Sequence, residues 1–252
     1  MRILLLDIET APNLVYAWGM FNQNLSIDKI VEPGYTMCFS AKWYGENEVM
    51  FFSVFHDGEK RMVQAAHDLL TEADAVIHYN GTRFDIPTLN KEFLLNGMDP
   101  PEPYKQIDLL HTVRKQFRLA SNKLDYVCQQ LGIGGKVEHK GMSLWKECMD
   151  GVKESWNLMR EYNERDTTLL EELYIHLLPW IEKHPNHALY HDTEKPVCPN
   201  CGSTHLQSRG TQHNTFTQSY NRYKCIGCGS WVRERFTAVP KEKRKHILAK
   251  AV

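Results

Sequence analysis

The sequence lacks the long apolar runs of membrane proteins, and it has no internal repeats or low-complexity tracts. None of its apolar stretches approaches the roughly 18 consecutive residues that a membrane span needs. Its first residues lead into a strand-like run, without the charged and then apolar pattern of a secretory signal. The 252 residues are 42% hydrophobic, which suits one substantial core and a small additional module. We therefore expect a soluble globular protein with a cytoplasmic location.

The chain also has almost no net charge, −1 at pH 7, but the two parts of the chain differ. Residues 195–252 hold 11 basic and 2 acidic residues, a net charge of +9, whereas residues 1–194 hold 19 basic and 29 acidic residues, a net charge of −10. A basic tail on an acidic body indicates a polyanionic partner for the tail. A charged, solvated terminus is the alternative that charge alone leaves open.

An even set of cysteines, as in a disulfide framework, is absent too. The seven cysteines are an odd number in a chain without a secretory signal, which argues against disulfides and for metal binding. Cys38, Cys128 and Cys148 are scattered among apolar residues, and we expect them to be buried and reduced. The other four form two close pairs in the basic tail.

These pairs, CPNCG at 198–202 and CIGCG at 225–229, are Cys-x-x-Cys-Gly turns with 23 residues between them. The glycine lets each turn close tightly, so that both thiolates of a pair can reach one tetrahedral Zn²⁺. Zinc would also help so small a module to fold. His205 and His213 are substitute ligands, but four cysteines complete the shell. We predict a zinc ribbon with one structural Zn²⁺ held by Cys198, Cys201, Cys225 and Cys228.

Aromatic and basic residues interleave in this ribbon. Such a mixture suits stacking on bases and neutralising phosphates. Alternatively, the aromatic residues form the small ribbon core and the basic residues keep it soluble, and we expect a combination of the two. The residues are Phe216, Tyr220, Arg222, Tyr223, Lys224, Trp231, Arg233 and Arg235. A nucleic acid or a protein partner remains open for the ribbon, and residues 239–252 add non-specific attraction to phosphates.

The first 180 residues read as strands followed increasingly by helices. Three early strands indicate an antiparallel meander. A long amphipathic pattern from about 153 to 181 indicates a helix that stops near Pro179. The expected strands are 3–8, 36–44, 48–54 and 75–78, and the expected helices are 59–70, 86–96, 107–117, 123–131 and 153–181. We predict an α/β class with a mixed central sheet flanked by helices. The expected domains are 1–183, a linker 184–195, the ribbon 196–238 and a basic tail 239–252.

Asp7 and Glu9 end the first apolar run. Side chains alternate along a strand, so these two carboxylates share a face. At about 4 Å their repulsion is on the order of 4 kcal/mol, which favours a bound cation or a shared proton. A strand end that simply faces water is the alternative. Asp85 follows an Asn-Gly turn at the start of a helix, where capping of that helix is the simpler interpretation.

Tyr162 and Asp166 lie four residues apart on one face of the long helix. Considered alone, they could be a tyrosine at the core margin beside a solvated acid. Together with the other acids they supply four carboxylates and a phenol, which suit two divalent ions about 3.5–4 Å apart. Oxygen ligands favour Mg²⁺ or Mn²⁺ over Zn²⁺, and the phenol suits a hydrogen bond that orients water.

DIET at 7–10, NGTRFD at 80–85 and YNERD at 162–166 resemble, in this order, the three motifs of the DEDD (DnaQ-like) exonucleases. The match is to the tyrosine subclass, DEDDy, which includes the proofreading domains of family B DNA polymerases, and it covers roughly residues 1–180. The histidine subclass uses the position five before the last aspartate, which is Glu161 here, so the tyrosine assignment is the consistent one.

This resemblance implies an RNase H-like fold and release of nucleoside 5′-monophosphates from 3′ ends. It implies that Asp7 bridges two metal ions and that Glu9 and Asp166 hold the ion that activates water. It further implies that Asp85 helps to hold the second ion and that Tyr162 orients the nucleophile.

Further residues are candidates for substrate binding. Thr10 and Asn80 match family positions that touch the terminal nucleotide. Lys136, His139 and Lys140 lie in a glycine-rich loop, 132–141, where phosphate contacts and a mobile surface loop are alternative interpretations. Asp108 falls in a region that borders the site in relatives, and we favour helix capping over catalysis for it.

The sequence thus predicts a metal-dependent 3′–5′ exonuclease, a hydrolase of phosphodiester bonds with two Mg²⁺ or Mn²⁺ and one structural Zn²⁺. We expect single-stranded DNA as substrate, and a separate polymerase or other replication or repair protein as a further partner through the ribbon. The motifs do not separate ribose from deoxyribose. The alternatives are an RNA exonuclease, a structure-specific endonuclease, or a nucleic-acid-binding or scaffold protein on an inactive nuclease fold.

Overall fold

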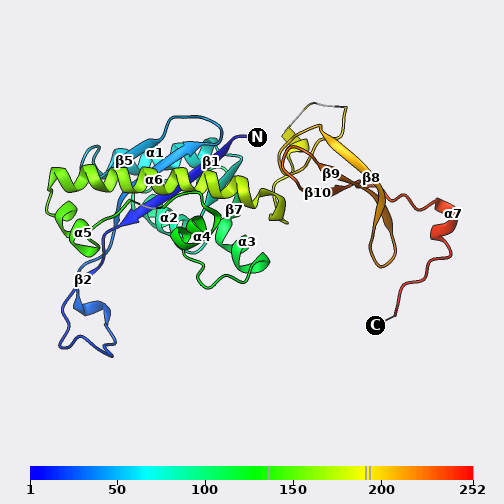
Figure 1. The fold of residues 1–252 in the computed structure, drawn as a ribbon. Helices are drawn as coiled ribbons and strands as arrows, with labels where there is room; N and C mark the ends of the chain where they lie inside the picture. The colour runs from blue at the N-terminus through cyan, green and yellow to red at the C-terminus, as the bar shows by residue number, and fades with distance from the viewer. Residues whose placement is uncertain (136, 191, 193, 252) are drawn as a thin grey trace. The chain divides into compact units, whose positions relative to one another are not determined.

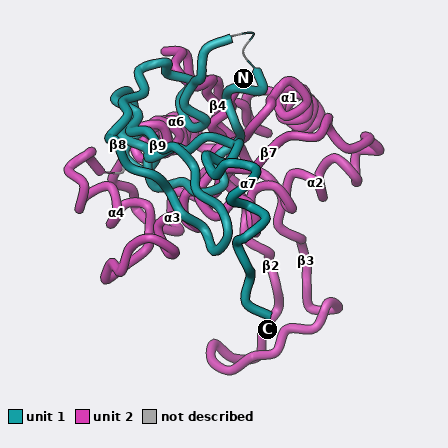
Figure 2. Tube along the Cα trace, turned by 90° about the vertical axis from the view of Figure 1, so that its right-hand side faces the viewer, with its two compact units in different colours: residues 1, 175–252 teal, residues 2–174 magenta. Residues whose placement is uncertain are grey.

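The computed structural model describes residues 1–135, 137–190, 192 and 194–251, and the chain divides into two compact units. Residues 2–174 form the larger unit, and residue 1 with residues 175–252 forms the smaller one (Figure 2). This division falls inside a continuous helix, so the finer bounds expected for linker, ribbon and tail stay a prediction. None of the helices described is both long and apolar enough to cross a membrane.

The larger unit is built on a five-stranded mixed sheet (Figure 1). The order of its strands is β5-β4-β1-β6-β7. The central strand β1 pairs antiparallel with β4 and parallel with β6. β4 and β5 are antiparallel, which confirms the early meander, whereas β6 and β7 are parallel. The strands are β1 Ile3–Thr10, β4 Thr36–Trp43, β5 Met50–Ser53, β6 Ala75–His78 and β7 Lys105–Asp108.

Helices cover both faces of this sheet, because β1 sends alternate side chains to each. Leu4, Leu6 and Ile8 of β1 pack in one core cluster with helices α1 (Glu59–Glu72) and α2 (Asp85–Leu95). A second cluster joins β4 to α5 (Met142–Met149) and to the long helix α6 (Lys153–Leu177). The intervening residues of β1 therefore face the second side. The remaining helices of this unit are α3 Leu109–Gln116 and α4 Leu124–Leu131.

The predicted α/β class with a mixed sheet flanked by helices is confirmed, but two details were wrong or missed. A helix was expected from residue 107, whereas Ile107 pairs with Ile77 in the edge strand β7 and the helix begins at Leu109. The short helix α5 was not expected. The long helix ends at Leu177, close to Pro179 as expected, and the 3₁₀ turn η2 (Leu178–Trp180) follows it.

An arm that the sequence did not indicate interrupts the larger unit between β1 and β4. It consists of the short paired strands β2 (Leu14–Val15) and β3 (Ile30–Glu32) and the 3₁₀ turn η1 (Ile27–Lys29). Figures 1 and 2 both show this arm standing away from the sheet and helices of the larger unit.

The smaller unit holds an antiparallel three-stranded sheet in the order β10-β9-β8. Its strands are β8 Leu206–Asn214, β9 Ser219–Cys225 and β10 Trp231–Arg233, followed by the short helix α7 Lys241–Arg244; the 3₁₀ turn η3 is His187–Tyr190. Among its described residues from 201 onward, only Cys225 and Ser230 are buried. Such a small core supports the expectation that this module needs a further stabilising interaction.

Candidate functional site

Three of the predicted acids lie together in the larger unit. Asp7 and Glu9 come from the end of β1 and Asp166 from the middle of α6, and one carboxylate oxygen of each lies within 4.8 Å of the others. Asp166 is buried, with 2% of its surface exposed, while Asp7 and Glu9 are half-buried. Carboxylates at such distances repel by several kcal/mol unless a cation lies between them. An all-oxygen donor set of this kind fits a hard divalent cation such as Mg²⁺ or Mn²⁺.

Small polar residues let α6 approach β1 and β4 closely at this point. Ser40 lies opposite Asp7 in the β1–β4 register, and its hydroxyl donates to the backbone oxygen of Asn163 at 2.8 Å and contacts the Thr167 hydroxyl at 2.5 Å. Asn163 Nδ2 in turn donates to Asp7 Oδ2 at 2.7 Å. Sequence reasoning missed this interaction, although Asn163 stands directly beside Tyr162 in the third motif. Asn163 therefore orients the Asp7 carboxylate.

Asp85 lies next to these acids but outside the group of three. It is the first residue of α2, is 4% exposed, and its Oδ1 accepts a hydrogen bond of 3.3 Å from the backbone N–H of Ile8. Ile8 is the residue between Asp7 and Glu9, so Asp85 is fixed to the same strand end. The simple capping interpretation lacks support, since the N-cap of α2 is Phe84 and no side chain caps the helix.

Burial raises the pKa of the Asp85 carboxyl to about 7, and the negative charge of Asp108 adds to the rise. The hydrogen bond from Ile8 works in the opposite direction and only partly offsets the burial. An ionised Asp85 is thus poorly compensated by the protein itself. A cation at this position would supply the missing compensation.

The Asn-Gly turn before α2 sets the start of that helix. Asn80 has a positive φ of 70°, and its N–H donates to Asp108 Oδ1 at 3.0 Å. Gly81 N–H donates to His78 Nδ1 at 3.1 Å, and a Cβ at Gly81 would lie 2.4 Å from His78 Cγ. Glycine is therefore required where the backbone passes over the buried histidine.

His78 and Asp108 are structural parts of the same turn. Because His78 Nδ1 accepts from Gly81, its Nε2–H donates to Gln106 Oε1 at 3.1 Å, and burial lowers the pKa of His78. The imidazole is thus held neutral. Asp108 Oδ1 accepts from Leu110 N–H at 3.1 Å as the N-cap of α3, so the capping interpretation of Asp108 is confirmed.

Tyr162 lies one helical turn before Asp166 and is mostly buried. Its ring contacts those of His139 and Trp145, with centroids 4.8 and 6.0 Å away. The loop that contains His139 therefore packs over the tyrosine rather than standing free. The side chain of Arg165 also binds this loop, donating to the backbone oxygens of Ile133 and Gly135 at 3.4 Å.

The residues predicted to bind substrate do not all lie near the acids. Thr10 ends β1 and pairs with Thr36 after a bulge, close in sequence to Glu9, and Asn80 lies in the turn before Asp85. Lys140 is exposed and lines a cavity of about 480 Å³ with Leu144, Glu147 and Ser155, a lining that contains none of the predicted acids. Lys136 falls outside the described residues. These roles stay predictions.

The four cysteines of the smaller unit also lie together, each with its sulfur within 4.8 Å of the others. Cys198 and Cys228 sulfurs are 3.7 Å apart, and those of Cys201 and Cys225 are 3.6 Å apart. A tetrahedron of sulfurs about 2.3 Å from a central Zn²⁺ has edges of about 3.8 Å, so the spacing fits that ion and excludes disulfides. Burial raises the pKa of Cys198 to about 11, and a bound cation would offset this cost of ionisation.

The two cysteine turns have the same backbone hydrogen bonds. Cys198 N–H donates to Ser203 O and Gly202 N–H to Cys198 O, at 2.8 and 2.9 Å. The second turn repeats this from Cys225 to Ser230 and from Gly229 to Cys225, at 2.8 and 3.0 Å. Both glycines have positive φ, 73° and 82°, as the sequence pattern required. Two equivalent turns present four sulfurs to one point.

One face of the ribbon sheet gathers basic and aromatic side chains; we call it the basic face and define it as Tyr220, Arg222, Lys224, Trp231 and Arg233. Trp231 pairs with Lys224, and Arg233 pairs with Arg222, and directly paired residues share a face. The guanidinium of Arg222 lies 5.0 Å from the Trp231 ring centroid, and that of Arg233 lies 4.0 Å from the Tyr220 ring. These contacts hold the cations over two rings, of which Trp231 is exposed and Tyr220 is half-buried.

The other aromatic residues of the ribbon divide differently. Tyr223 lies on the opposite face, where its hydroxyl donates to Glu234 Oε1 at 2.6 Å. Phe216 is fully exposed at the β8–β9 turn. The two expected roles are therefore found on different faces of the sheet. Tyr223 has a structural role on one face, and Tyr220 and Trp231 belong to the basic face.

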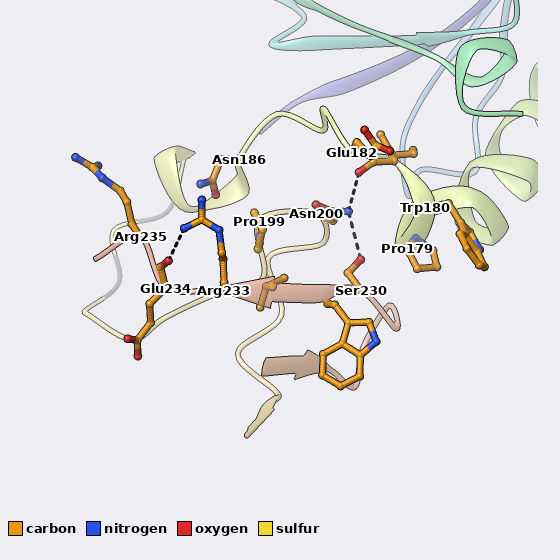
Figure 3. Close-up of a pocket in the computed structure, with 13 residues that line it drawn as sticks. Pro179, Trp180, Glu182, Asn186, Pro199, Asn200, Ser230, Arg233, Glu234 and Arg235 are labelled. Atoms are coloured by element: carbon orange, nitrogen blue, oxygen red, sulfur yellow. Dashed lines mark hydrogen bonds between the residues drawn. The ribbon is translucent and has the colours of Figure 1, made fainter. Parts of the chain in front are cut away.

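A cavity of about 470 Å³ lies within the smaller unit beside the first cysteine turn (Figure 3). Asn200, from that turn, donates to the backbone oxygens of Leu178 and Ile181 at 2.9 and 3.4 Å and to Ser230 Oγ at 3.3 Å. Arg233 and Trp231 also line the cavity, which therefore adjoins the basic face. Asn200 thus joins both cysteine turns to the segment after α6.

Comparison with known proteins defines the class of this protein: the chain belongs to the RNase_H superfamily, whose family model matches residues 28–178. The matched region includes Asp85, Tyr162 and Asp166 but begins after Asp7 and Glu9. Together with the fold, this membership supports a nuclease. No curated protein matches the sequence significantly.

One similar solved structure is a family B DNA polymerase from the hyperthermophilic archaeon Pyrobaculum calidifontis. It superposes with a TM-score of 0.55 and 17% sequence identity, over 71% of this chain and 24% of the polymerase chain. At this identity the likeness is one of fold, and this chain spans only 24% of the polymerase.

Proposed function

We propose that the protein is a metal-dependent 3′–5′ exonuclease that removes nucleoside 5′-monophosphates from single-stranded DNA. The observation that carries this proposal is the convergence of Asp7, Glu9 and Asp166 within 4.8 Å, with Asp85 hydrogen-bonded to the strand between the first two. Mutually repelling acids on three different elements give a purely structural role no advantage. They suit a site that binds divalent cations and a phosphodiester.

Asp7, Glu9, Asp85 and Asp166 would hold two Mg²⁺ or Mn²⁺ ions, with Asp7 shared between them. When bound, these ions would supply electrostatic stabilisation of the phosphate and a nucleophilic water at neutral pH. Asn163 keeps the Asp7 carboxylate in one orientation through its 2.7 Å hydrogen bond. Tyr162, one turn from Asp166 and fixed by the rings of His139 and Trp145, would orient the attacking water through its hydroxyl.

Two features support the 3′–5′ direction. The three motifs resemble those of the tyrosine-type DEDD exonucleases, and a family B DNA polymerase shares the fold over most of this chain. Thr10 and Asn80 flank the acids along β1 and before α2, where they would contact the terminal nucleotide. An RNA exonuclease or a structure-specific endonuclease with the same acids is the alternative that the experiment below separates.

The cysteine cluster would hold one structural Zn²⁺, and the basic face of the ribbon would bind nucleic acid. Cations beside the rings of Trp231 and Tyr220 offer phosphate neutralisation, and the exposed Trp231 ring offers base stacking. This arrangement favours a single strand, whose unpaired bases can stack on the ring while its phosphates meet the cations. A polymerase or repair protein could still reach the ribbon through its opposite face.

We propose a ribbon at 196–238, joined by a linker at 184–195 to a nuclease domain at 1–183 and followed by a basic tail at 239–252.

The experiment that tests the proposal is incubation of 5′-labelled oligonucleotides with Mg²⁺, with Mn²⁺ and without divalent ions. Single- and double-stranded DNA and RNA are compared, which separates the alternatives. We expect cleavage only with a divalent ion and preferentially of single-stranded DNA. Binding without cleavage on every substrate would instead indicate a nucleic-acid-binding protein on an inactive nuclease fold.

A further inference from the structure

The arm between β1 and β4 carries the most exposed apolar side chains of the larger unit. Trp18 is 94% exposed, Met20 92%, Phe21 82% and Tyr16 76%. Figures 1 and 2 show the segment that carries them standing away from the sheet and helices of that unit. Apolar side chains that stay this exposed contribute little burial energy to the fold. A cluster of them on the surface therefore indicates a site that binds another molecule.

The root of the arm is rigid, so the position of its tip is set. Lys91 Nζ donates to Gly34 O at 3.0 Å, and the neighbouring Glu92 accepts from Thr36 N–H at 3.0 Å. Gly34 N–H also donates to Asn13 Oδ1 at 2.7 Å, which joins the outgoing and returning strands. Both anchoring side chains belong to α2, the helix that begins at Asp85.

Both strands at the root of the arm, the outgoing and the returning one, lie next to the acid cluster. The outgoing chain leaves β1 at Thr10, directly after Glu9, and the returning chain enters β4, where Cys38 pairs with Glu9 and Ser40 with Asp7. The base of the arm therefore lies beside the place where the acids would hold a phosphodiester.

The composition of the tip identifies the part of a polynucleotide that it would contact. Residues 16–27 contain no charged side chain, but they contain three aromatic rings and the carboxamides of Asn22, Gln23 and Asn24. Without cations the tip has no charge with which to neutralise phosphates. Rings stack on unpaired bases and carboxamides can pair with base edges.

We propose that this arm, residues 12–34, stacks against unpaired nucleobases of the substrate just before they reach the acids. The proposal rests on the proposed nuclease function, because it names what approaches that site. It assigns base contacts to the arm and phosphate contacts to the basic face of the ribbon. The arm's contribution to binding is therefore independent of salt.

The test compares the full-length protein with the Trp18→Ala, Phe21→Ala double variant. Binding of a fluorescein-labelled single-stranded oligonucleotide is measured by anisotropy without divalent ions, which prevents cleavage. A second oligonucleotide of the same length carries abasic residues at its 3′ end. The Leu94→Ala, Leu95→Ala variant is the matched control, since these exposed side chains lie on α2.

We expect the double variant to bind the ordinary oligonucleotide about tenfold or more weakly, with an unchanged slope of log Kd against log salt concentration. It should bind the abasic oligonucleotide as tightly as the unaltered protein does. Equal affinity for the ordinary oligonucleotide, or an equal loss on both, would overturn the proposal. Conversion of a dimer to a monomer by the substitutions, seen by sedimentation, would assign the arm to a second copy and overturn it too.

Cleavage with Mg²⁺, followed in parallel, separates the two proposals. If the protein cleaves nothing but the binding difference persists, the nuclease function fails and the arm still contacts bases. If cleavage is normal and the binding difference is missing, only the arm proposal fails.

Discussion

Asp85, which we propose as a metal ligand, is a residue whose ionisation opposes the stability of the fold. Its carboxyl is buried at the start of α2, and the pKa is raised from 3.8 to about 7. Between these pH values the folded state retains a proton that the unfolded state has lost. Stability therefore falls as the pH rises through this window, and the full cost of ionising Asp85 is present above about pH 7.

Asp85→Asn should therefore stabilise the protein at pH 8 in buffer without divalent ions, by on the order of 2–4 kcal/mol. Below about pH 4 the effect should disappear, because Asp85 is then protonated in both states. Denaturant unfolding at the two pH values measures the difference, with the exposed Asp99→Asn as control. A stabilisation by Asp85→Asn, relative to the unaltered protein, that is no larger at pH 8 than at pH 4 would contradict this account of Asp85.

The acids illustrate what the residues themselves could predict. The alternation along β1 placed Asp7 and Glu9 on one face, and the helical spacing placed Tyr162 one turn from Asp166. The role of Asn163 could not be found in this way, because an asparagine inside a helix carries no signal until its partner is known. Its hydrogen bond to Asp7 joins residues 156 positions apart.

Among the elements, the turn between β6 and α2 is the most constrained. A Cβ at Gly81 would lie 2.4 Å from Cγ of the buried His78. His78 or the backbone would have to move, which would break the hydrogen bonds from Gly81 to His78 and from His78 to Gln106. Gly97, at the end of α2, has φ +69° but nothing near its missing Cβ.

Gly81→Ala should destabilise the protein by about 3 kcal/mol or more, whereas Gly97→Ala should cost only about 1 kcal/mol. Denaturant unfolding of the two variants measures these losses. Similar small losses in both would show that the turn can relax around the added methyl group.

The elements predicted correctly from the sequence have strong patterns of their own. Examples are the apolar run of β1 and the amphipathic pattern that extends over the whole of α6. The polar edge strand β7 was missed, because its residues Lys105 and Gln106 resemble a surface segment. Its pairing with β6 depends on tertiary contacts that the local sequence does not show. The arm was missed for a related reason. Its apolar residues face solvent, so the usual link between hydrophobicity and burial does not hold there.

At the scale of the whole molecule, the two units differ in what holds them together. The larger unit has two extensive core clusters, whereas the described part of the ribbon buries little besides Cys198 and Cys225. A structural Zn²⁺ would then stabilise the smaller unit alone.

Removal of zinc by a strong chelator, followed by dialysis into Mg²⁺, should abolish the thermal transition of the ribbon and leave that of the larger unit. Cleavage of a short oligonucleotide should persist, while affinity for a long single strand falls and its dependence on salt becomes weaker, because the basic face is lost. Calorimetry and anisotropy measure these effects. If the protein instead shows one thermal transition that shifts to lower temperature when zinc is removed, and cleavage is lost as well, the units do not fold independently.

The central claim is that Asp7 belongs to a metal site that removes nucleotides from 3′ ends. The most direct measurement follows a 5′-labelled single-stranded oligonucleotide with Mg²⁺, using the unaltered protein, Asp7→Asn and the exposed-site control Asp99→Asn. We expect a ladder that shortens from the 3′ end with the protein and the control, and at least about a hundredfold slower cleavage with Asp7→Asn. A ladder unaffected by Asp7→Asn, or immediate release of the labelled 5′ nucleotide, would contradict the claim.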